Sequence, residues 1–235
     1  MEQAFLRTEQ LLGKEALARL RQSRVIVFGL GGVGSYAVEA LARTGIGTIG
    51  LVDFDRVAVS NLNRQLIATQ KTIGQRKTDA AAQRIADIAP WVTVECYPLC
   101  YDAAHADAVD LAQYDYVIDA IDMVSSKLLL IERADAMGLP IISAMGAGNK
   151  LDPTQLEVAD ISQTAVCPLA RVMRRELKKR GIEHLRVVYS RETPHNIVSE
   201  GDKRPNGRPA PGSVAFVPAV AGLLLAGEVV RALCQ

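Results

Sequence analysis

The sequence predicts an α/β fold in which a mainly parallel, doubly wound sheet carries helices on both faces. Two observations predict it. A glycine cluster stands between a short apolar run and a helical pattern near the N-terminus, and apolar runs of strand length then alternate with helical patterns as far as residue 144. Strands that alternate with helices pair in parallel, because each helix returns the chain to the same end of the sheet.

Residues 24–55 read RVIVFGLGGVGSYAVEALARTGIGTIGLVDFD and set this pattern. The apolar run 25–28 has the length and β-branched content of a buried parallel strand. A helical pattern follows and ends at Gly45. A second apolar run, 49–52, stops at Asp53. The segment is therefore predicted to form a strand, a turn, a helix and a second strand.

A cluster of glycines occupies the turn between the first strand and its helix. Its members are Gly29, Gly31, Gly32 and Gly34. Glycines tolerate positive φ and let the backbone approach a phosphate closely, and the amides at the helix N-terminus then bind the anion. Asp53 ends the second strand, where a carboxylate accepts ribose hydroxyls in Rossmann-like units. A GxGxxG alone is weak, but in this context it predicts a nucleotide-binding Rossmann-like core.

The remaining elements follow from the same periodicities. Strands are predicted at 92–97, 116–121, 139–144 and 184–189. Helices are predicted at 9–22, 78–88, 125–137 and 168–180. The donor-rich segment 54–77 is expected to form a loop, a short helix and a loop, and the apolar stretch 214–230 a strand followed by a buried helix.

The chain length and composition indicate one domain. It has 235 residues, 49% of them hydrophobic, with 27 basic against 26 acidic residues. This balance excludes a strongly basic nucleic-acid binder but not a local basic face. We expect a single domain over 1–235, with a nucleotide-binding core at 1–145. The C-terminal part, 146–235, carries the basic helix 168–180 and a Pro- and Gly-rich loop, 199–212, that is expected to be mobile.

The sequence has no recognisable targeting signal or metal-binding pattern, so we expect an ordinary cytoplasmic protein. The N-terminus, MEQAFLRTEQ, has no apolar core of a signal peptide. The apolar stretch 214–230 is interrupted by proline, glycine and glutamate, so no membrane span is predicted. The four cysteines contain no CxxC pair, so we expect neither disulfides nor a structural zinc site.

Polar residues that suit a nucleoside triphosphate follow the glycine turn. They are Asp53 and Asp55 after the second strand, Asn61, Arg64 and Gln65 in NLNRQ, Lys77 in IGQRK, and Asp122 after a later strand. Arginine and lysine neutralise phosphate oxygens, and a carboxylate such as Asp122 can hold Mg²⁺ that bridges the phosphates. Each residue alone also suits a plainer role, a solvated loop for Arg64 and Lys77 or an N-cap for Asp122. Their joint occurrence favours ATP.

The same residues resemble a known family. GLGGVG at 29–34, DFD at 53–55, NLNRQ, the lysine of GQRK, and DAID at 119–122 are similar to the ubiquitin-activating-enzyme-like adenylating superfamily over about residues 1–165. The resemblance implies ATP with Mg²⁺, adenylation of a carboxylate, and a homodimer. It also implies that Arg64, Lys77 and Asp122 serve the phosphates and the metal, and that Arg7 reaches into the partner subunit's site.

The second half of the chain resembles one branch of that family. Members that activate sulfur-carrier proteins commonly hold zinc with CxxC pairs, which this chain lacks. The segments MGAGNKLDPTQLEVADISQT and PLARVMRRELKKRG look like the threonylcarbamoyladenosine dehydratases, which act on tRNA. Three alternatives stay open: an activator of a sulfur-carrier protein, with or without a sulfur-transfer partner, a non-catalytic nucleotide-binding module, and a dehydrogenase.

The predicted helix 168–180 is strongly basic. The residues we expect to contact tRNA phosphates are Arg171, Arg174, Arg175, Lys178 and Lys179. The alternative is a solvated amphipathic helix with no ligand. Cys167 lies just before this helix, where a thiol could be reactive; a small buried residue is the interpretation we favour.

Overall fold

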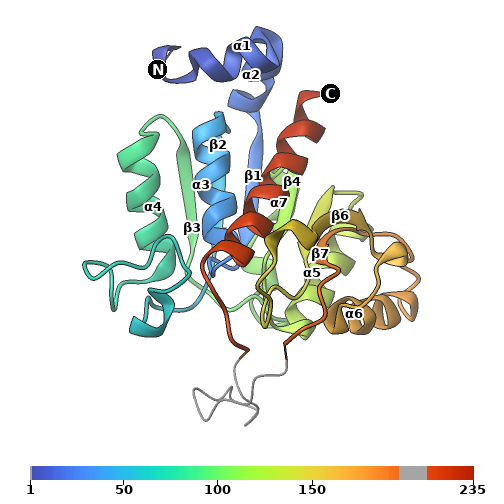
Figure 1. The fold of residues 1–235 in the computed structure, drawn as a ribbon. Coiled ribbons are helices and arrows are strands. Elements are labelled where there is room, and N and C mark those ends of the chain that lie inside the picture. The colour runs from blue at the N-terminus through green and yellow to red at the C-terminus, as the bar shows by residue number, and fades with distance from the viewer. Residues whose placement is uncertain (1, 196–210) are drawn as a thin grey trace.

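A single sheet organises the molecule, as shown by a computed structural model that describes residues 2–195 and 211–235 (Figure 1). Its seven strands lie in the order β3-β2-β1-β4-β5-β7-β6. The strands are β1 Arg24–Phe28, β2 Thr48–Val52, β3 Thr93–Tyr97, β4 Tyr116–Asp119, β5 Ile141–Ala144, β6 Leu156–Asp160 and β7 Arg186–Ser190. All neighbours are parallel except β6, which is antiparallel to β7. The predicted doubly wound, mainly parallel sheet is confirmed.

Helices cover both faces of this sheet (Figure 1). The helices on the faces are α3 Gly34–Thr44, α4 Lys77–Ile88, α5 Val124–Ala136, α6 Pro168–Lys178 and α7 Phe216–Cys234. Two more, α1 Leu6–Leu12 and α2 Lys14–Gln22, lie beyond the amino-terminal ends of the strands (Figure 1). One core lies between the sheet and α3, α4 and α7. Two further cores lie on the other face, under α5 and α6 and under the segment 99–114. The Rossmann-like class follows from this layering.

The helices α3 and α7 lie unusually close together. A Cβ added at Gly222 of α7 would lie 2.2 Å from the carbonyl oxygen of Val33, so only glycine permits this approach. Leu41 of α3 and Leu225 of α7 are both fully buried in the same core. Burial of each such leucine contributes about 1.5–3 kcal/mol to folding. The contact fixes α7 against the helix that begins at the glycine turn.

Two sequence predictions on the fold are wrong in detail, and one strand was missed. The predicted helix 9–22 is two helices, because Gly13 takes a φ of 87° and breaks it. The edge strand β6 was not predicted, since its half-buried residues give little alternation. The strand expected at the start of 214–230 does not form among the described residues 211–215. The loop predicted at 199–212 lies mostly outside the described residues.

The last helix was predicted to be a buried element of the fold. By length and composition α7 is the one described helix that could cross a membrane, with a mean hydropathy of 1.8 over its most apolar window. Its buried residues pack on the sheet and on α3. The helix therefore serves the core, as the sequence predicts.

Candidate active site at the carboxyl end of the sheet

The glycine turn after β1 contains glycines of two kinds. Gly29 has a φ of 86°, and a Cβ there would lie 2.6 Å from the carbonyl oxygen of Ala120. A Cβ at Gly34 would lie 1.8 Å from the carbonyl oxygen of Gly29. At Gly31, by contrast, the nearest neighbour is the side-chain nitrogen of Gln65, at 3.9 Å. The first two glycines are required by the backbone itself, whereas Gly31 faces open space.

The side chain of Gln65 lies beside that open space. Gln65 is only 7% exposed, and its Oε1 atom is buried with no hydrogen-bond partner among the described residues. The Gln65 atom that faces the space at Gly31 is therefore Nε2, a hydrogen-bond donor. A Cβ added at Gly32 would lie 3.4 Å from the Cγ of Arg64 and 3.2 Å from Pro218, at the start of α7. The NLNRQ segment therefore lines the glycine turn, as predicted.

The turn that carries Arg64 is held by its own polar groups. The side chain of Asn61 accepts a hydrogen bond from the amide of Ala58 at 3.0 Å, so Asn61 shapes the turn. Arg64 donates to the carbonyl of Ser60 at 2.8 Å and to Asn63 Oδ1 at 2.9 Å. These bonds hold the guanidinium against Ser60 and Asn63, while the Cγ of Arg64 lies beside Gly32.

Asp53, Asp55 and Lys77 form one cluster at the end of β2. Lys77 Nζ lies 2.7 Å from Asp55 Oδ2 and 3.7 Å from Asp53 Oδ1. Asp53 accepts from the amides of Leu30 at 2.6 Å and Asp55 at 2.8 Å. Burial raises the pKa of Asp53, and the Lys77 ammonium opposes that rise. The sequence predicts these three residues as site members, and the fold brings them together.

Asp122 follows β4 and is exposed at the same edge of the sheet. Sequence reasoning missed two charged neighbours, Asp119 and Lys127, which form a fully buried ion pair of 2.8 Å. A signal was present, because the helical period places Lys127 on the apolar face of α5 with Leu130 and Ile131, where a charged side chain needs a partner.

Arg7 lies far from the other predicted residues. It is exposed on α1, which lies near the amino-terminal ends of the strands, whereas the glycine turn follows the carboxyl-terminal end of β1 (Figure 1). Within one chain Arg7 is therefore separated from the site by the length of the strands.

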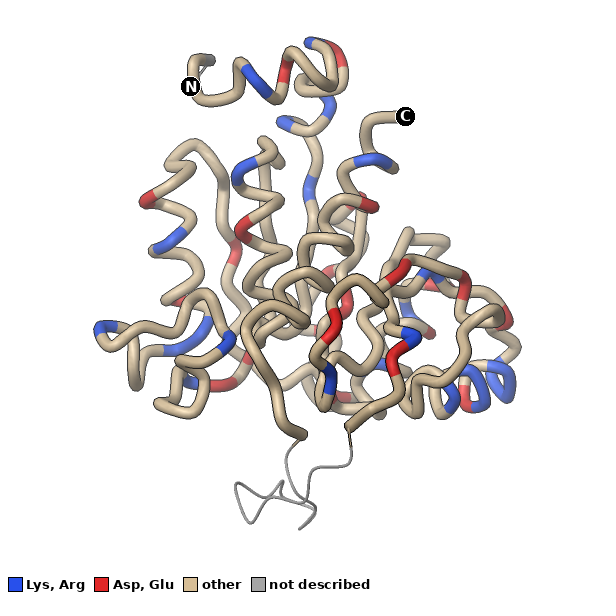
Figure 2. Tube along the Cα trace, viewed as in Figure 1, with Lys and Arg blue, Asp and Glu red and all other residues tan. Residues whose placement is uncertain are grey.

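The basic residues of α6 are not equivalent. Figure 2 shows lysines and arginines along this helix, and Arg171, Arg175, Lys178 and Lys179 are exposed. Arg174 instead donates to the carbonyl of Thr164 at 2.8 Å and to the carbonyl of Ile161 at 3.2 Å. Its guanidinium stabilises the preceding turn, which is a structural task that charge counting did not foresee. Cys167 is 2% exposed in the core beneath this helix, which confirms the buried interpretation.

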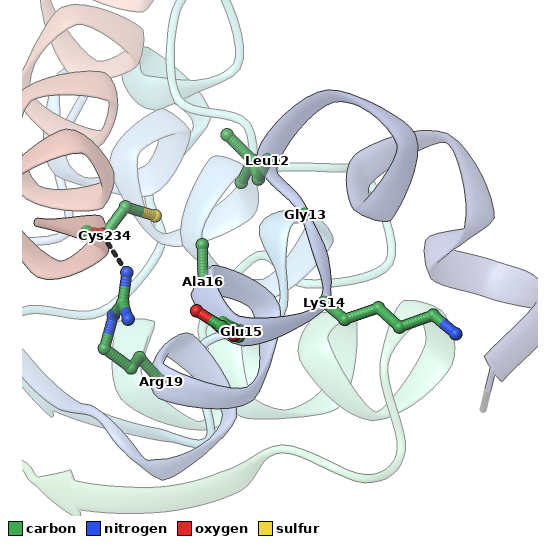
Figure 3. A pocket seen from close by; sticks show the side chains of 7 residues that line it. All are labelled: Leu12, Gly13, Lys14, Glu15, Ala16, Arg19 and Cys234. Atoms are coloured by element: carbon green, nitrogen blue, oxygen red, sulfur yellow. Dashed lines mark hydrogen bonds between the residues drawn. The ribbon is translucent and has the colours of Figure 1, made fainter.

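A shallow hollow of about 370 Å³ lies at the other end of the molecule (Figure 3). It is lined by Leu12, Gly13, Lys14, Glu15, Ala16, Arg19 and Cys234. The guanidinium of Arg19 donates to the carbonyl of Cys234, so the contact ties the end of α7 to α2. The hollow contains none of the predicted site residues, and we assign it no chemistry.

Comparison with known proteins agrees with this geometry. The chain is 43% identical over 240 residues to a tRNA threonylcarbamoyladenosine dehydratase of Bacillus subtilis, covering 98% of this chain and 94% of that protein. Crystal structures of the E. coli tRNA N6-threonylcarbamoyladenosine dehydratase, with AMP and with ATP, are both 34% identical and cover 98% of this chain. They superpose with TM-scores of 0.89 and 0.87 and are themselves covered to 94% and 93%. The model of the ThiF family matches residues 5–235. The chain belongs to the ThiF family.

Proposed function

We propose that this protein is an ATP-dependent tRNA threonylcarbamoyladenosine dehydratase. It adenylates the threonine carboxylate of the modified adenosine and then closes a ring with net loss of water. The observation that carries this proposal is the similarity to enzymes of that name over nearly the full length of both chains. The polar residues at the carboxyl edge of the sheet supply what adenylation requires.

The glycine turn and its neighbours fit ATP. The space at Gly31 lets phosphate approach the backbone, and α3 begins three residues later with no side-chain cap, so its N-terminus is available to the anion. Asp53, fixed by two backbone amides, is oriented to accept the ribose hydroxyls. Gln65 Nε2, which lies beside the space at Gly31, is a donor for a phosphate oxygen.

Arg64 and Lys77 are assigned to the phosphates. Their positive charges stabilise the negative charge that grows on pyrophosphate as it leaves. Asp122 is the assigned Mg²⁺ ligand. Among the described residues no group of three or more acidic, histidine or cysteine side chains could hold a metal ion. The proposed ion is held by one carboxylate and by phosphate oxygens. Bound Mg²⁺ supplies further neutralisation of phosphate charge.

The reaction needs no nucleophile from the protein. A threonine carboxylate oxygen bonds to the α-phosphorus of ATP while the bond to the β-phosphate oxygen breaks, and pyrophosphate leaves. The neighbouring carbamoyl group then attacks the acyl carbon, AMP leaves with the former carboxylate oxygen, and a proton is lost. Because the attacking group is already tethered, the effective molarity is high. Burial of Cys167 agrees with this scheme.

We also propose that the chain is one domain that acts as a homodimer. The pairing of β5 with β7 joins the core, 1–145, to the C-terminal part, 146–235, in one sheet. Arg7 is exposed at the edge of the sheet remote from its own site. It can therefore contribute to phosphate binding only at the site of a second subunit. A tRNA substrate accords with action in the cytoplasm.

Alanine substitutions in the glycine turn should separate folding from nucleotide binding. Gly34→Ala is expected to lower the melting temperature sharply, because its Cβ would overlap the backbone of Gly29. Gly31→Ala is expected to keep the melting temperature and to weaken ATP binding, since its Cβ enters the phosphate space. Differential scanning fluorimetry with and without ATP measures both effects. Unchanged ATP affinity in Gly31→Ala would contradict the assigned phosphate position.

The exposed basic face of α6 is proposed to contact tRNA. Neither Arg171 nor Lys178 forms an ion pair with a described residue. Replacing both by glutamate should weaken tRNA binding by about tenfold or more and reduce its salt dependence, because phosphate contacts release counterions. ATP affinity should not change. The control is Lys14→Glu, which reverses an exposed charge at the start of α2, at the other end of the molecule. If this control weakens tRNA binding equally, α6 is not part of the tRNA interface.

The function is tested with tRNA that carries threonylcarbamoyladenosine. After incubation with ATP and Mg²⁺, the nucleosides are analysed by mass spectrometry for loss of one water, and the nucleotides for AMP. Loss of water that requires ATP supports the proposal. An unchanged tRNA, with pyrophosphate exchange into ATP on addition of a sulfur-carrier protein, would replace it by the sulfur-carrier alternative.

A further inference from the structure

A buried ion pair that the proposed chemistry does not use lies under the end of β4. The side chains of Asp119 and Lys127 are both 0% exposed, and Lys127 Nζ lies 2.8 Å from Asp119 Oδ2. Asp119 ends β4, and Lys127 is one turn into α5. Removing two charges from water is costly, and apolar residues of similar volume often stabilise a fold as well or better. Stability alone is therefore a weak reason for this pair.

The remaining hydrogen bonds of the pair act on one short turn. Asp119 Oδ1 accepts from the amide of Ile121 at 3.1 Å, and Lys127 Nζ donates to the carbonyl of the same residue at 3.1 Å. Both polar groups of the Ile121 backbone are thus held by one ion pair. The next residue is Asp122, the assigned metal ligand, so the position of its carboxylate depends on this turn.

The pair also joins the turn to the neighbouring strand. Lys127 Nζ donates to the carbonyl of Ala144, the last residue of β5, at 2.8 Å. Ser143 Oγ, also on β5, donates to Asp119 Oδ2 at 2.5 Å. All donors of the ammonium and the buried carboxylate oxygens are therefore engaged by the ends of β4 and β5. The ion pair therefore links the carboxyl ends of β4 and β5, which no turn of the chain connects directly.

We propose that Lys127 and Asp119 are positioning residues that hold Asp122 at the nucleotide-bound metal. This inference rests on the proposed function, in which Asp122 contacts Mg²⁺. The pair acts on the backbone of Ile121 and does not touch the nucleotide. Residues that orient a metal ligand without contacting the metal typically change metal affinity by about 10–100-fold.

The test measures metal binding separately from folding. Mn²⁺ is titrated into the full chain with α,β-methylene ATP and followed by electron paramagnetic resonance, and the melting temperature is recorded in parallel. Lys127→Met leaves Asp119 buried and unpaired, so it should lower both quantities. The double variant Asp119→Leu/Lys127→Met removes both charges. It should recover much of the melting temperature and yet bind Mn²⁺ about 10–100-fold more weakly than the wild type.

Two further variants keep the proposal falsifiable. Lys150→Met removes an equally hidden ammonium, 3% exposed, which donates to the carbonyl of Gly146 beyond β5; it should leave Mn²⁺ affinity unchanged. Ser143→Ala removes only the hydroxyl that holds Asp119. It should retain the fold and weaken Mn²⁺ binding by less than the double variant does, which gives a result even where the double variant does not fold.

The outcomes distinguish this proposal from the function on which it rests. Wild-type Mn²⁺ affinity in the folded double variant, or in Ser143→Ala where the double variant does not fold, would reduce the pair to a structural element. If Asp122→Ala leaves the Mn²⁺ affinity unchanged, Asp122 is not a metal ligand and the proposal is overturned. The titration uses no tRNA. Failure to modify tRNA would therefore leave these binding results unaffected and would count against the proposed function alone.

Discussion

Replacing Lys77 by alanine is expected to lower ATP–pyrophosphate exchange by about 10²–10³-fold, because one preorganised positive charge on the departing phosphates is lost. The side chain is 7% exposed and is already aimed at the Asp53 and Asp55 carboxylates, so it is fixed before the nucleotide binds. Loss of the ammonium also removes the charge that holds down the pKa of buried Asp53. The melting temperature should therefore fall modestly while the fold is retained.

The matched control for this prediction is Lys71→Ala. Lys71 lies in the loop before α4 and is exposed, so its removal changes the net charge equally without touching the cluster. Exchange should stay near the wild-type rate in this variant. Near-normal exchange in Lys77→Ala, with Lys71→Ala as the reference, would refute the assignment of Lys77 to the phosphates.

Mixing two inactive variants is expected to restore activity if Arg7 acts across a dimer. Arg7→Ala and Lys77→Ala should each be nearly inactive alone. In a mixed dimer, one site receives Arg7 from one chain and Lys77 from the other and is complete. Random reassortment of a two-fold dimer yields such sites in about a quarter of the total, so about 25% of wild-type activity should return.

The control for complementation uses two variants of the same site. Lys77→Ala mixed with Arg64→Ala offers no complete site unless Arg64 also acts in trans, and it should stay inactive. Exchange is measured after subunits are mixed at high concentration and allowed to reassort, and size-exclusion chromatography reports the dimer. Absence of recovery in the mixture of Arg7→Ala with Lys77→Ala would contradict the proposed contribution of Arg7 to the site of a second subunit.

The strands next to the glycine turn could be predicted because they are buried on both faces. Val25 to Phe28 of β1 and all residues of β2 are buried, so their sequences are continuous apolar runs. The edge strand β6 has only half-buried residues and gave no such signal. The break at Gly13 also escaped prediction, since an isolated glycine interrupts a helix only when its φ is unsuitable.

The site residues on loops were predictable from chemistry, whereas their supports were not. Asp53, Arg64 and Lys77 stand in short motifs whose residue types match phosphate and ribose. The roles of Arg174 and Lys127 depend on which distant carbonyls come within reach, at Thr164 and Ala144, and that is decided only when the chain is folded. Counting charges therefore identified the basic helix but overestimated the number of guanidinium groups available to a ligand.

The two kinds of glycine in the turn after β1 predict how this sequence would change if the activity were lost. Selection on folding alone still demands Gly29 and Gly34, because the chain's own backbone occupies the space of their side chains. Gly31 lacks such a constraint and would accept alanine or serine once no nucleotide had to enter. A descendant that keeps Gly29 and Gly34 but has a larger residue in place of Gly31 would accordingly be a folded protein that no longer binds the nucleotide. Its sequence alone would reveal this loss.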